Sequence, residues 1–167
     1  MVTRSSPKRT VLVADDDEVA LEALGDLLEH AGYRVLLAPS GEEALCLLRN
    51  ADPAPDMILL DLMMPGMDGW QVVSRLRVHP ALSEVPVVIM SAGGSAVLAT
   101  APVADAYVAK PLQANQLLHV VQRTLTLADM RKRPGRSSGV HTVRPMHAPL
   151  VEEPGPPEDL AKRGRAR

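Results

Sequence analysis

Residues 9–17 read Arg-Thr-Val-Leu-Val-Ala-Asp-Asp-Asp, and this stretch decides the fold. Its apolar run, Val11 to Ala14, stops abruptly at three aspartates. A short apolar run without alternating polar residues is typical of a strand that is buried on both faces. Such a strand belongs in a parallel sheet between two layers of helices, so we expect an α/β domain.

The rest of the chain alternates short apolar runs with amphipathic segments. Further strands are predicted at 33–38, 56–61, 85–90 and 106–109. Helices are predicted at 18–31, at 70–78 and at 114–127, with one more that starts near 41 and another that ends near 101. Asp17 is the expected N-cap of the first helix, and Ser40 with Glu43 forms a capping-box pattern. Five strands that alternate with five helices predict a doubly wound parallel sheet covered on both faces.

Charge divides the chain into an acidic part and a basic tail. Residues 1–130 hold 9 Lys and Arg against 16 Asp and Glu, a net charge of −7, whereas residues 131–167 hold 9 against 4, a net charge of +5. The tail also holds 6 prolines and 4 glycines and few branched apolar residues. We therefore expect a flexible N-terminus at 1–8, one globular domain at 9–128 and a disordered basic tail at 129–167.

Cysteine content and hydropathy indicate in which cellular compartment the protein is expected. The single cysteine, Cys46, excludes an internal disulfide and a cysteine-based metal cluster, and its place in the second helix predicts a small core residue. The first ten residues contain no apolar signal region, and no apolar run approaches the ~20 residues that span a bilayer. We expect a cytoplasmic protein with no membrane contact.

Polar residues follow the predicted strands where they end. Asp15, Asp16 and Asp17 follow the first strand, Asp61 ends the third, Ser91 the fourth and Lys110 the fifth. In a parallel sheet these ends meet at one edge, where α/β proteins bind ligands. Clustered carboxylates raise each other's pKa unless a cation lies among them, and Mg²⁺ prefers one or two carboxylates with water and phosphate oxygens.

This set of groups predicts phosphoryl chemistry. A carboxylate beside Mg²⁺ can attack phosphorus, while the metal and a lysine offset the charge on the phosphoryl oxygens and a hydroxyl donates to one of them. Taken singly, the residues have plainer interpretations: Asp15 to Asp17 as a solvated N-cap run, Ser91 as a helix cap, Tyr107 as a packing residue. Their combination with Asp61 and Lys110 favours a site that forms an aspartyl phosphate.

These motifs resemble the receiver domain of bacterial response regulators, including the single-domain chemotaxis type. They are Val13-Ala14-Asp15-Asp16-Asp17, Asp61-Leu62-Met63-Met64-Pro65-Gly66-Met67-Asp68-Gly69, Ser91-Ala92 and Tyr107-Val108-Ala109-Lys110-Pro111. They occur in the family's order over residues 9–128. The resemblance implies a flavodoxin-like fold with strand order 2-1-3-4-5.

The resemblance also implies a role for each matching position. Asp15 and Asp16, with Asp61 and the backbone carbonyl of Met63, would hold Mg²⁺. Asp61 would be the phosphoacceptor, Lys110 the phosphate-binding lysine, Ser91 the switch hydroxyl and Tyr107 the switch aromatic residue. The cis-prone Lys110–Pro111 bond would direct the lysine.

The segment between Ser91 and Lys110 departs from the family pattern. It is short, it begins with Gly93 and Gly94, and Pro102 ends it early. We expect a short, mobile fourth helix in this segment. After Lys110–Pro111, Leu112 stands where the family usually has phenylalanine.

We expect a stand-alone response regulator of a two-component phosphorelay. It would be no enzyme in the usual sense, but a phosphoacceptor that assists its own phosphorylation and dephosphorylation. Its donor would be a histidine kinase, a histidine phosphotransfer protein or a small phosphodonor. We expect no DNA-binding or catalytic domain, so the expected readout is contact with a downstream protein, a homodimer or phosphate relay.

Two alternatives remain open at this point. One is a receiver-fold interaction module with weak or no phosphorylation-dependent switching. The other is a Mg²⁺-dependent phosphatase with an aspartyl nucleophile, which Met63 argues against because that class has a carboxylate at this position.

Overall fold

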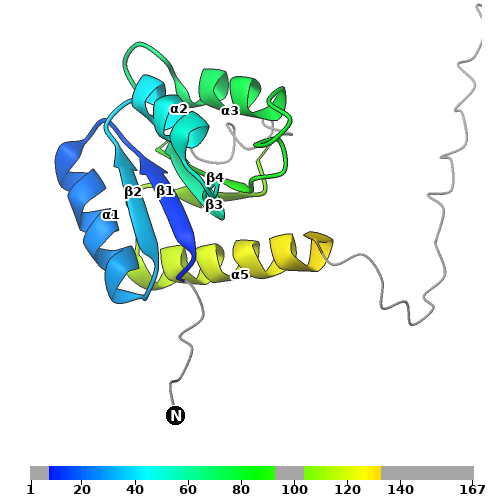
Figure 1. Ribbon diagram of the computed structural model, residues 1–167. Helices are drawn as coiled ribbons and strands as arrows, with labels where there is room; N and C mark the ends of the chain where they lie inside the picture. The colour runs from blue at the N-terminus through cyan, green and yellow to red at the C-terminus, as the bar shows by residue number, and fades with distance from the viewer. Residues whose placement is uncertain (1–7, 93–103, 133–167) are drawn as a thin grey trace, which may run out of the picture. The chain divides into compact units, whose positions relative to one another are not determined.

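A five-stranded parallel sheet forms the centre of the computed structural model, which describes residues 8–92 and 104–132 (Figure 1). The strands are β1 (Thr10–Ala14), β2 (Arg34–Ala38), β3 (Met57–Asp61), β4 (Val87–Ser91) and β5 (Ala106–Ala109). Their order in the sheet is β2-β1-β3-β4-β5, and every neighbouring pair is parallel. The predicted topology is therefore confirmed.

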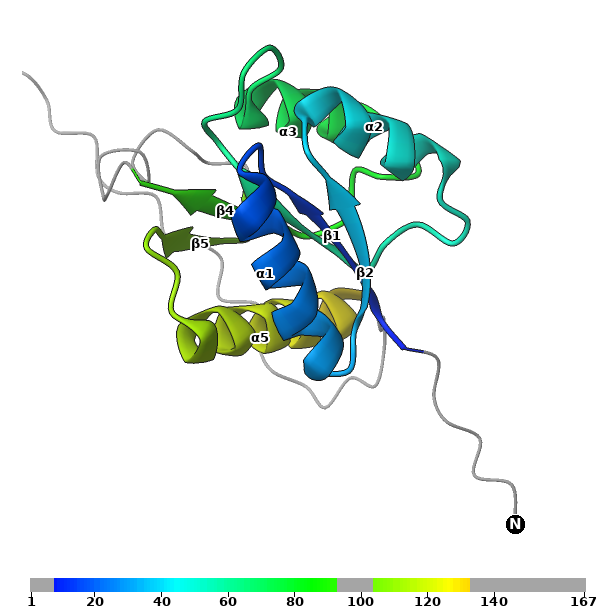
Figure 2. The same cartoon turned by 90° about the vertical axis from the view of Figure 1, so that its left-hand side faces the viewer.

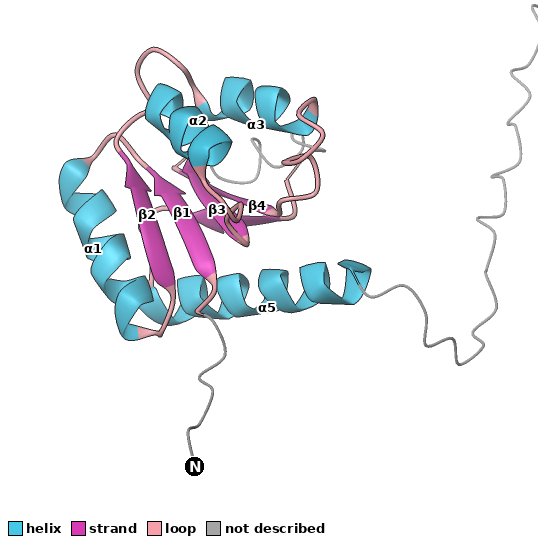
Figure 3. Ribbon diagram, viewed as in Figure 1, coloured by secondary structure: helices cyan, strands magenta, loops and turns pink. Residues whose placement is uncertain are grey.

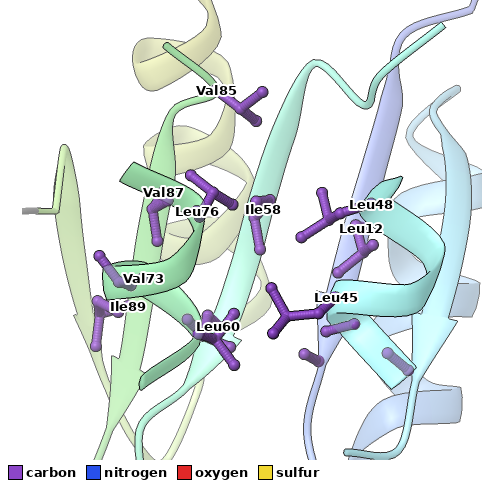
Figure 4. Packing of buried hydrophobic residues seen from close by; sticks show 14 of the residues in the cluster. Leu12, Leu45, Leu48, Ile58, Leu60, Val73, Leu76, Val85, Val87 and Ile89 are labelled. Carbon is purple, nitrogen blue, oxygen red and sulfur yellow. The ribbon is translucent and has the colours of Figure 1, made fainter. Parts of the chain in front are cut away.

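Four helices are described, two on each face of the sheet (Figures 2 and 3). They are α1 (Glu18–His30), α2 (Gly41–Asn50), α3 (Gly69–Arg77) and α5 (Ala114–Lys132). Apolar side chains of α1 and α5 pack on one face in a single buried cluster, and those of α2 and α3 pack on the other. Figure 4 shows the second cluster, in which Leu12 and Ile58 of the sheet lie beside Leu48 of α2.

Local sequence explains where the first three helices begin. The Asp17 side chain accepts hydrogen bonds from the backbone N–H groups of Val19 and Ala20, so Asp17 is the N-cap of α1 as predicted. Ser40 caps α2 by accepting from the N–H of Glu43, and Asp68 caps α3 in the same way. These side chains satisfy donors that would otherwise have no partner in the first turn.

Two features differ from the sequence expectations. α5 continues to Lys132, beyond the predicted end at 127, because Ala128 is buried and two ion pairs, Arg9–Asp129 and Asp105–Arg131, hold its last turns. Residues 129–132, expected to begin the tail, are thus helical. The prediction that Cys46 is a core residue was wrong: it is exposed, because Ala44, Leu45 and Leu48 form the buried side of α2.

Several expectations concern parts of the chain that the structure does not describe. The flexible N-terminus, the short fourth helix and the basic tail beyond Lys132 lie outside the described residues. Among the helices that are described, none has the length and apolar character to span a bilayer.

Candidate functional site

Two aspartates lie side by side at the carboxyl edge of the sheet. The register pairs Ala14 with Leu60, so Asp15 and Asp61 follow at adjacent positions of β1 and β3. Both side chains are almost completely buried, with exposed fractions of 0% for Asp15 and 5% for Asp61. Two buried carboxylates side by side repel each other, so a positive charge close by stabilises the pair.

Lys110 supplies that charge. Its Nζ donates to Asp15 Oδ2 at 2.8 Å and to Asp61 Oδ2 at 2.6 Å. The lysine directly follows β5, its backbone N–H donates to the carbonyl of Ser91, and the Lys110–Pro111 bond is cis. Burial acts to lower the pKa of Lys110, but hydrogen bonds and attraction from the two aspartates outweigh it, so the pKa is raised above its ordinary value.

Backbone amides occupy the other oxygen of each buried carboxylate. The N–H of Asp17 donates to Asp15 Oδ1 at 3.1 Å, and the N–H of Met63 donates to Asp61 Oδ1 at 3.2 Å. No buried side-chain nitrogen or oxygen atom in the described part of the chain lacks a hydrogen-bond partner. The orientation of both carboxylates is therefore set by the protein before any ligand binds.

Asp16 completes an acidic group that fits a divalent cation. One carboxylate oxygen from each of Asp15, Asp16 and Asp61 lies within 4.8 Å of the others, and Asp16 is exposed to solvent. Oxygen donors of this kind suit a hard cation such as Mg²⁺, and the exposed side leaves room for water and phosphate oxygens. Asp17, in contrast, uses its carboxylate to cap α1.

The loop after β3 brings backbone groups against Asp61. Met63 lies in this loop with an exposed side chain, and its N–H faces Asp61. At the end of the loop, Gly69 packs so tightly that a Cβ atom there would lie 2.5 Å from the Asp61 carbonyl oxygen. The role of the Met63 carbonyl as a metal ligand remains a prediction.

Ser91 and Tyr107 share one face of the sheet. Strand alternation places Ser91 on the face of Ile89, and Ile89 pairs with Tyr107, which packs against the cluster of α2 and α3. Burial raises the pKa of Tyr107, and a hydrogen bond with the backbone of Ala104 counteracts part of that effect. The structure thus puts both residues near the same edge, while their switch roles stay predictions.

Three structural contributors were not found from the sequence: two glycines close to the site, and one aspartate at the opposite, amino edge of β4 and β5. Gly41 and Gly69 pack against the ends of the loop after β3, and Asp105 joins Arg77 of α3 to Arg131 of α5. Close backbone approach has no signature in a single sequence, although Asp68-Gly69 within the quoted motif was a usable signal. Nothing in sequence spacing pointed to Asp105.

Comparison with known proteins agrees with the geometry. The family model described as the response regulator receiver domain matches residues 11–122. The transcriptional regulatory protein AfsQ1 of Streptomyces coelicolor is 37% identical over 111 residues, which cover 65% of this chain and 47% of that protein. The 3',5'-cyclic-nucleotide phosphodiesterase regA of Dictyostelium discoideum is 39% identical over 87 residues, which cover 52% of this chain and 11% of that protein.

Solved structures give the same result. A putative response regulator from Chloroflexus aurantiacus has 36% sequence identity and a TM-score of 0.64, covering 71% of this chain and 98% of that one. The chain spans less than half the length of the two curated relatives named above, so the likeness covers only part of each. On the match over residues 11–122 and the acidic site that it contains, the chain belongs to the response regulator receiver domain family.

Proposed function

We propose that the chain is a response regulator that accepts a phosphoryl group on Asp61 in a Mg²⁺-dependent reaction. One observation carries the proposal: Asp61 lies in a preformed group with Asp15, Asp16 and the Lys110 ammonium. The donor is a phosphohistidine on a histidine kinase or a histidine phosphotransfer protein, or a small acyl phosphate. The chain acts as a phosphoacceptor that assists its own modification.

The chemistry is a displacement at phosphorus. A carboxylate oxygen of Asp61 forms a bond to phosphorus while the bond from phosphorus to the donor's imidazole nitrogen breaks, and the electron pair leaves with the imidazole. Mg²⁺ held by Asp15, Asp16, Asp61 and the Met63 carbonyl would neutralise charge on the phosphoryl oxygens when bound. The carboxylates of buried Asp15 and Asp61 are held by hydrogen bonds from the backbone amides of Asp17 and Met63, so the site needs little reorganisation during the transfer.

Lys110 changes partner in this scheme. Its ammonium pairs with Asp15 and Asp61 in the structure described here, at 2.8 and 2.6 Å. Once Asp61 carries the phosphoryl group as an acyl phosphate, the negative charge moves outward onto the phosphoryl oxygens, and the ammonium follows that charge. The Ser91 hydroxyl then donates to a phosphoryl oxygen, and Tyr107 on the same face responds to that change.

A hollow beside the site supports a protein donor. A cavity of about 510 Å³ opens between α1 and the start of α5, and Lys110 lies at its edge with Asp17. Its remaining lining is mainly apolar, with Leu24 and Leu27 from α1 and Leu117 from α5. Apolar hollows of this kind suit side chains of a docking protein. The phosphorylated form then signals through contact with a downstream protein, a second copy or a further relay protein.

Incubation with acetyl phosphate and Mg²⁺, followed by intact-mass measurement, tests this proposal. The unsubstituted protein should gain one phosphoryl group, and Asp61→Asn should gain none. Asp16→Asn provides a matched control, because it leaves the acceptor in place and should slow the reaction without abolishing it at high Mg²⁺. Equal modification of Asp61→Asn would reject the acceptor. No modification of the unsubstituted protein would favour an interaction module that does not switch.

A further inference from the structure

Residues 62–68 form the loop that connects the phosphoacceptor strand to α3. The loop is short and carries Met63, whose N–H donates to Asp61 Oδ1. Its beginning is tied to the sheet by the bond from the N–H of Leu62 to the carbonyl of Met90, and its end by the bond from the N–H of Gly69 to the carbonyl of Leu62. A movement in the loop therefore changes the surroundings of the Asp61 carboxylate.

The far side of this loop rests on the first turn of α2. Gly41 is buried there, and a Cβ atom added to it would lie 2.5 Å from the Met67 carbonyl oxygen and 2.9 Å from Val72 Cγ2. The preceding loop residue, Gly66, has a φ of +75°, and a Cβ on it would lie 3.3 Å from Glu42 Oε1. Two successive residues of α2 thus meet two successive residues of the loop.

We infer that Gly41 is a positioning residue for the phosphoacceptor site, although it lies on a different element from every group that would contact metal or phosphate. The lack of a side chain at Gly41 lets the Met67 carbonyl, and with it the loop that holds Met63, take its place beside Asp61. This inference rests on the function proposed above and adds a residue to it.

The size of the effect follows from the contact distance. Ordinary contact with a Cβ begins at 3.4 Å, so a methyl group at position 41, placed 2.5 Å from the Met67 carbonyl oxygen, requires the start of α2 and the loop to separate by about 0.9 Å. The carbonyl is backbone and cannot rotate away alone. A misplacement of about 1 Å in a catalytic constellation costs on the order of 10²-fold in reactivity.

The experiment compares Gly41→Ala with Ser40→Ala. Ser40→Ala removes the hydrogen bond that caps α2, so it weakens the same helix end without placing an atom against the loop. Each protein is titrated with Mg²⁺ alone and then with beryllofluoride in the presence of Mg²⁺. The fluorescence of Trp70, the only tryptophan, follows binding because it adjoins Gly69. Circular dichroism and urea unfolding report the fold independently.

Gly41→Ala should weaken binding of Mg²⁺ and of beryllofluoride by about 10-fold or more, and Ser40→Ala by less than about 2-fold. Equal binding by Gly41→Ala, or an equal loss in Ser40→Ala, would overturn the inference. Absence of binding by the unsubstituted protein would instead reject the proposed function on which the inference depends.

A double variant separates the contact of the added methyl group with Val72 from its contacts with Met67. Gly41→Ala with Val72→Ala removes the Val72 Cγ2 contact and keeps the Met67 contact, and it also relieves crowding if the single variant does not fold. The double variant should fold and remain weak in both titrations. Recovery of normal binding would show that pressure on α3, and not on the loop, causes the defect, which would contradict the assignment.

Discussion

Replacement of Lys110 by methionine tests how the acidic site is held together without metal. The Lys110 ammonium bonds to two carboxylates whose side chains are 0% and 7% exposed, while its own side chain is 24% exposed. Removal of one partner from a buried ion pair costs about 3–5 kcal/mol, and partial exposure of the lysine reduces this to about 2–3 kcal/mol. For a domain of this size the loss corresponds to a fall of about 10 °C in Tm.

Thermal and urea unfolding in EDTA at pH 7 measure this loss. Mg²⁺ should restore most of it, because a divalent cation takes the place of the ammonium among the same oxygens, and a ligand at about 100 times its Kd stabilises by about 2.7 kcal/mol. The unsubstituted protein should gain less from Mg²⁺, since Lys110 competes for Asp15 and Asp61. Arg123→Met is the matched control, because Arg123 is an exposed cation on α5.

The reasoning would be refuted by either of two results. If Lys110→Met unfolds in EDTA at the same temperature as the unsubstituted protein, the ammonium does not neutralise the carboxylate pair. If Mg²⁺ stabilises both proteins equally, the metal and the lysine do not share oxygens.

Three further predictions concern a helix cap, a tyrosine and an aspartate that the structure holds by specific contacts. Asp17→Ala should destabilise the protein by about 1 kcal/mol in urea unfolding, because the α1 cap is lost. The affinity for Mg²⁺ should stay unchanged, because the backbone N–H of residue 17 still donates to Asp15. Weaker Mg²⁺ binding would instead make Asp17 a ligand. Burial raises the pKa of Tyr107 in the folded state above its ordinary value of 10.0, so stability should fall as the pH rises from 10.0 through the folded-state pKa. An alkaline absorbance titration should show a late tyrosine ionisation that is lost in Tyr107→Phe. An unchanged titration would contradict this. Asp105→Ala removes the acceptor of the Val87 N–H and one acceptor each from Arg77 and Arg131, which should cost about 2–3 kcal/mol and speed hydrogen exchange at the end of α5. Unchanged exchange at 127–132 would argue against this anchor.

Much of the fold could be predicted because buried strands and capped helices have local signatures. The run from Val11 to Ala14 and its abrupt end at Asp15 indicated both a buried strand and the edge at which the site lies. Parallel pairing then placed Asp15 beside Asp61, since the carboxyl ends of parallel strands meet. The acidic group of Asp15, Asp16 and Asp61 therefore follows from the sequence and parallel strand pairing alone.

The remaining features depend on contacts between distant residues. The length of α5 is set by Arg9 and Asp105, which lie 120 and 26 residues from their partners on the helix, and no periodicity reveals such pairing. The burial of Cys46 was mispredicted because a small apolar residue can lie on either side of a helix. The fit of Gly41 against Met67 is a matter of backbone separation, which residue types alone do not express.

The most direct test of the central claim is to locate the phosphoryl group chemically. Borohydride reduces an acyl phosphate to an alcohol, so a phosphorylated aspartate acquires a distinct mass that peptide mass spectrometry can place. After treatment with acetyl phosphate and Mg²⁺, the reduced residue should be Asp61, and its yield should fall sharply in EDTA. Reduction at Asp15 or Asp16, or an equal yield at Asp61 without metal, would contradict the account.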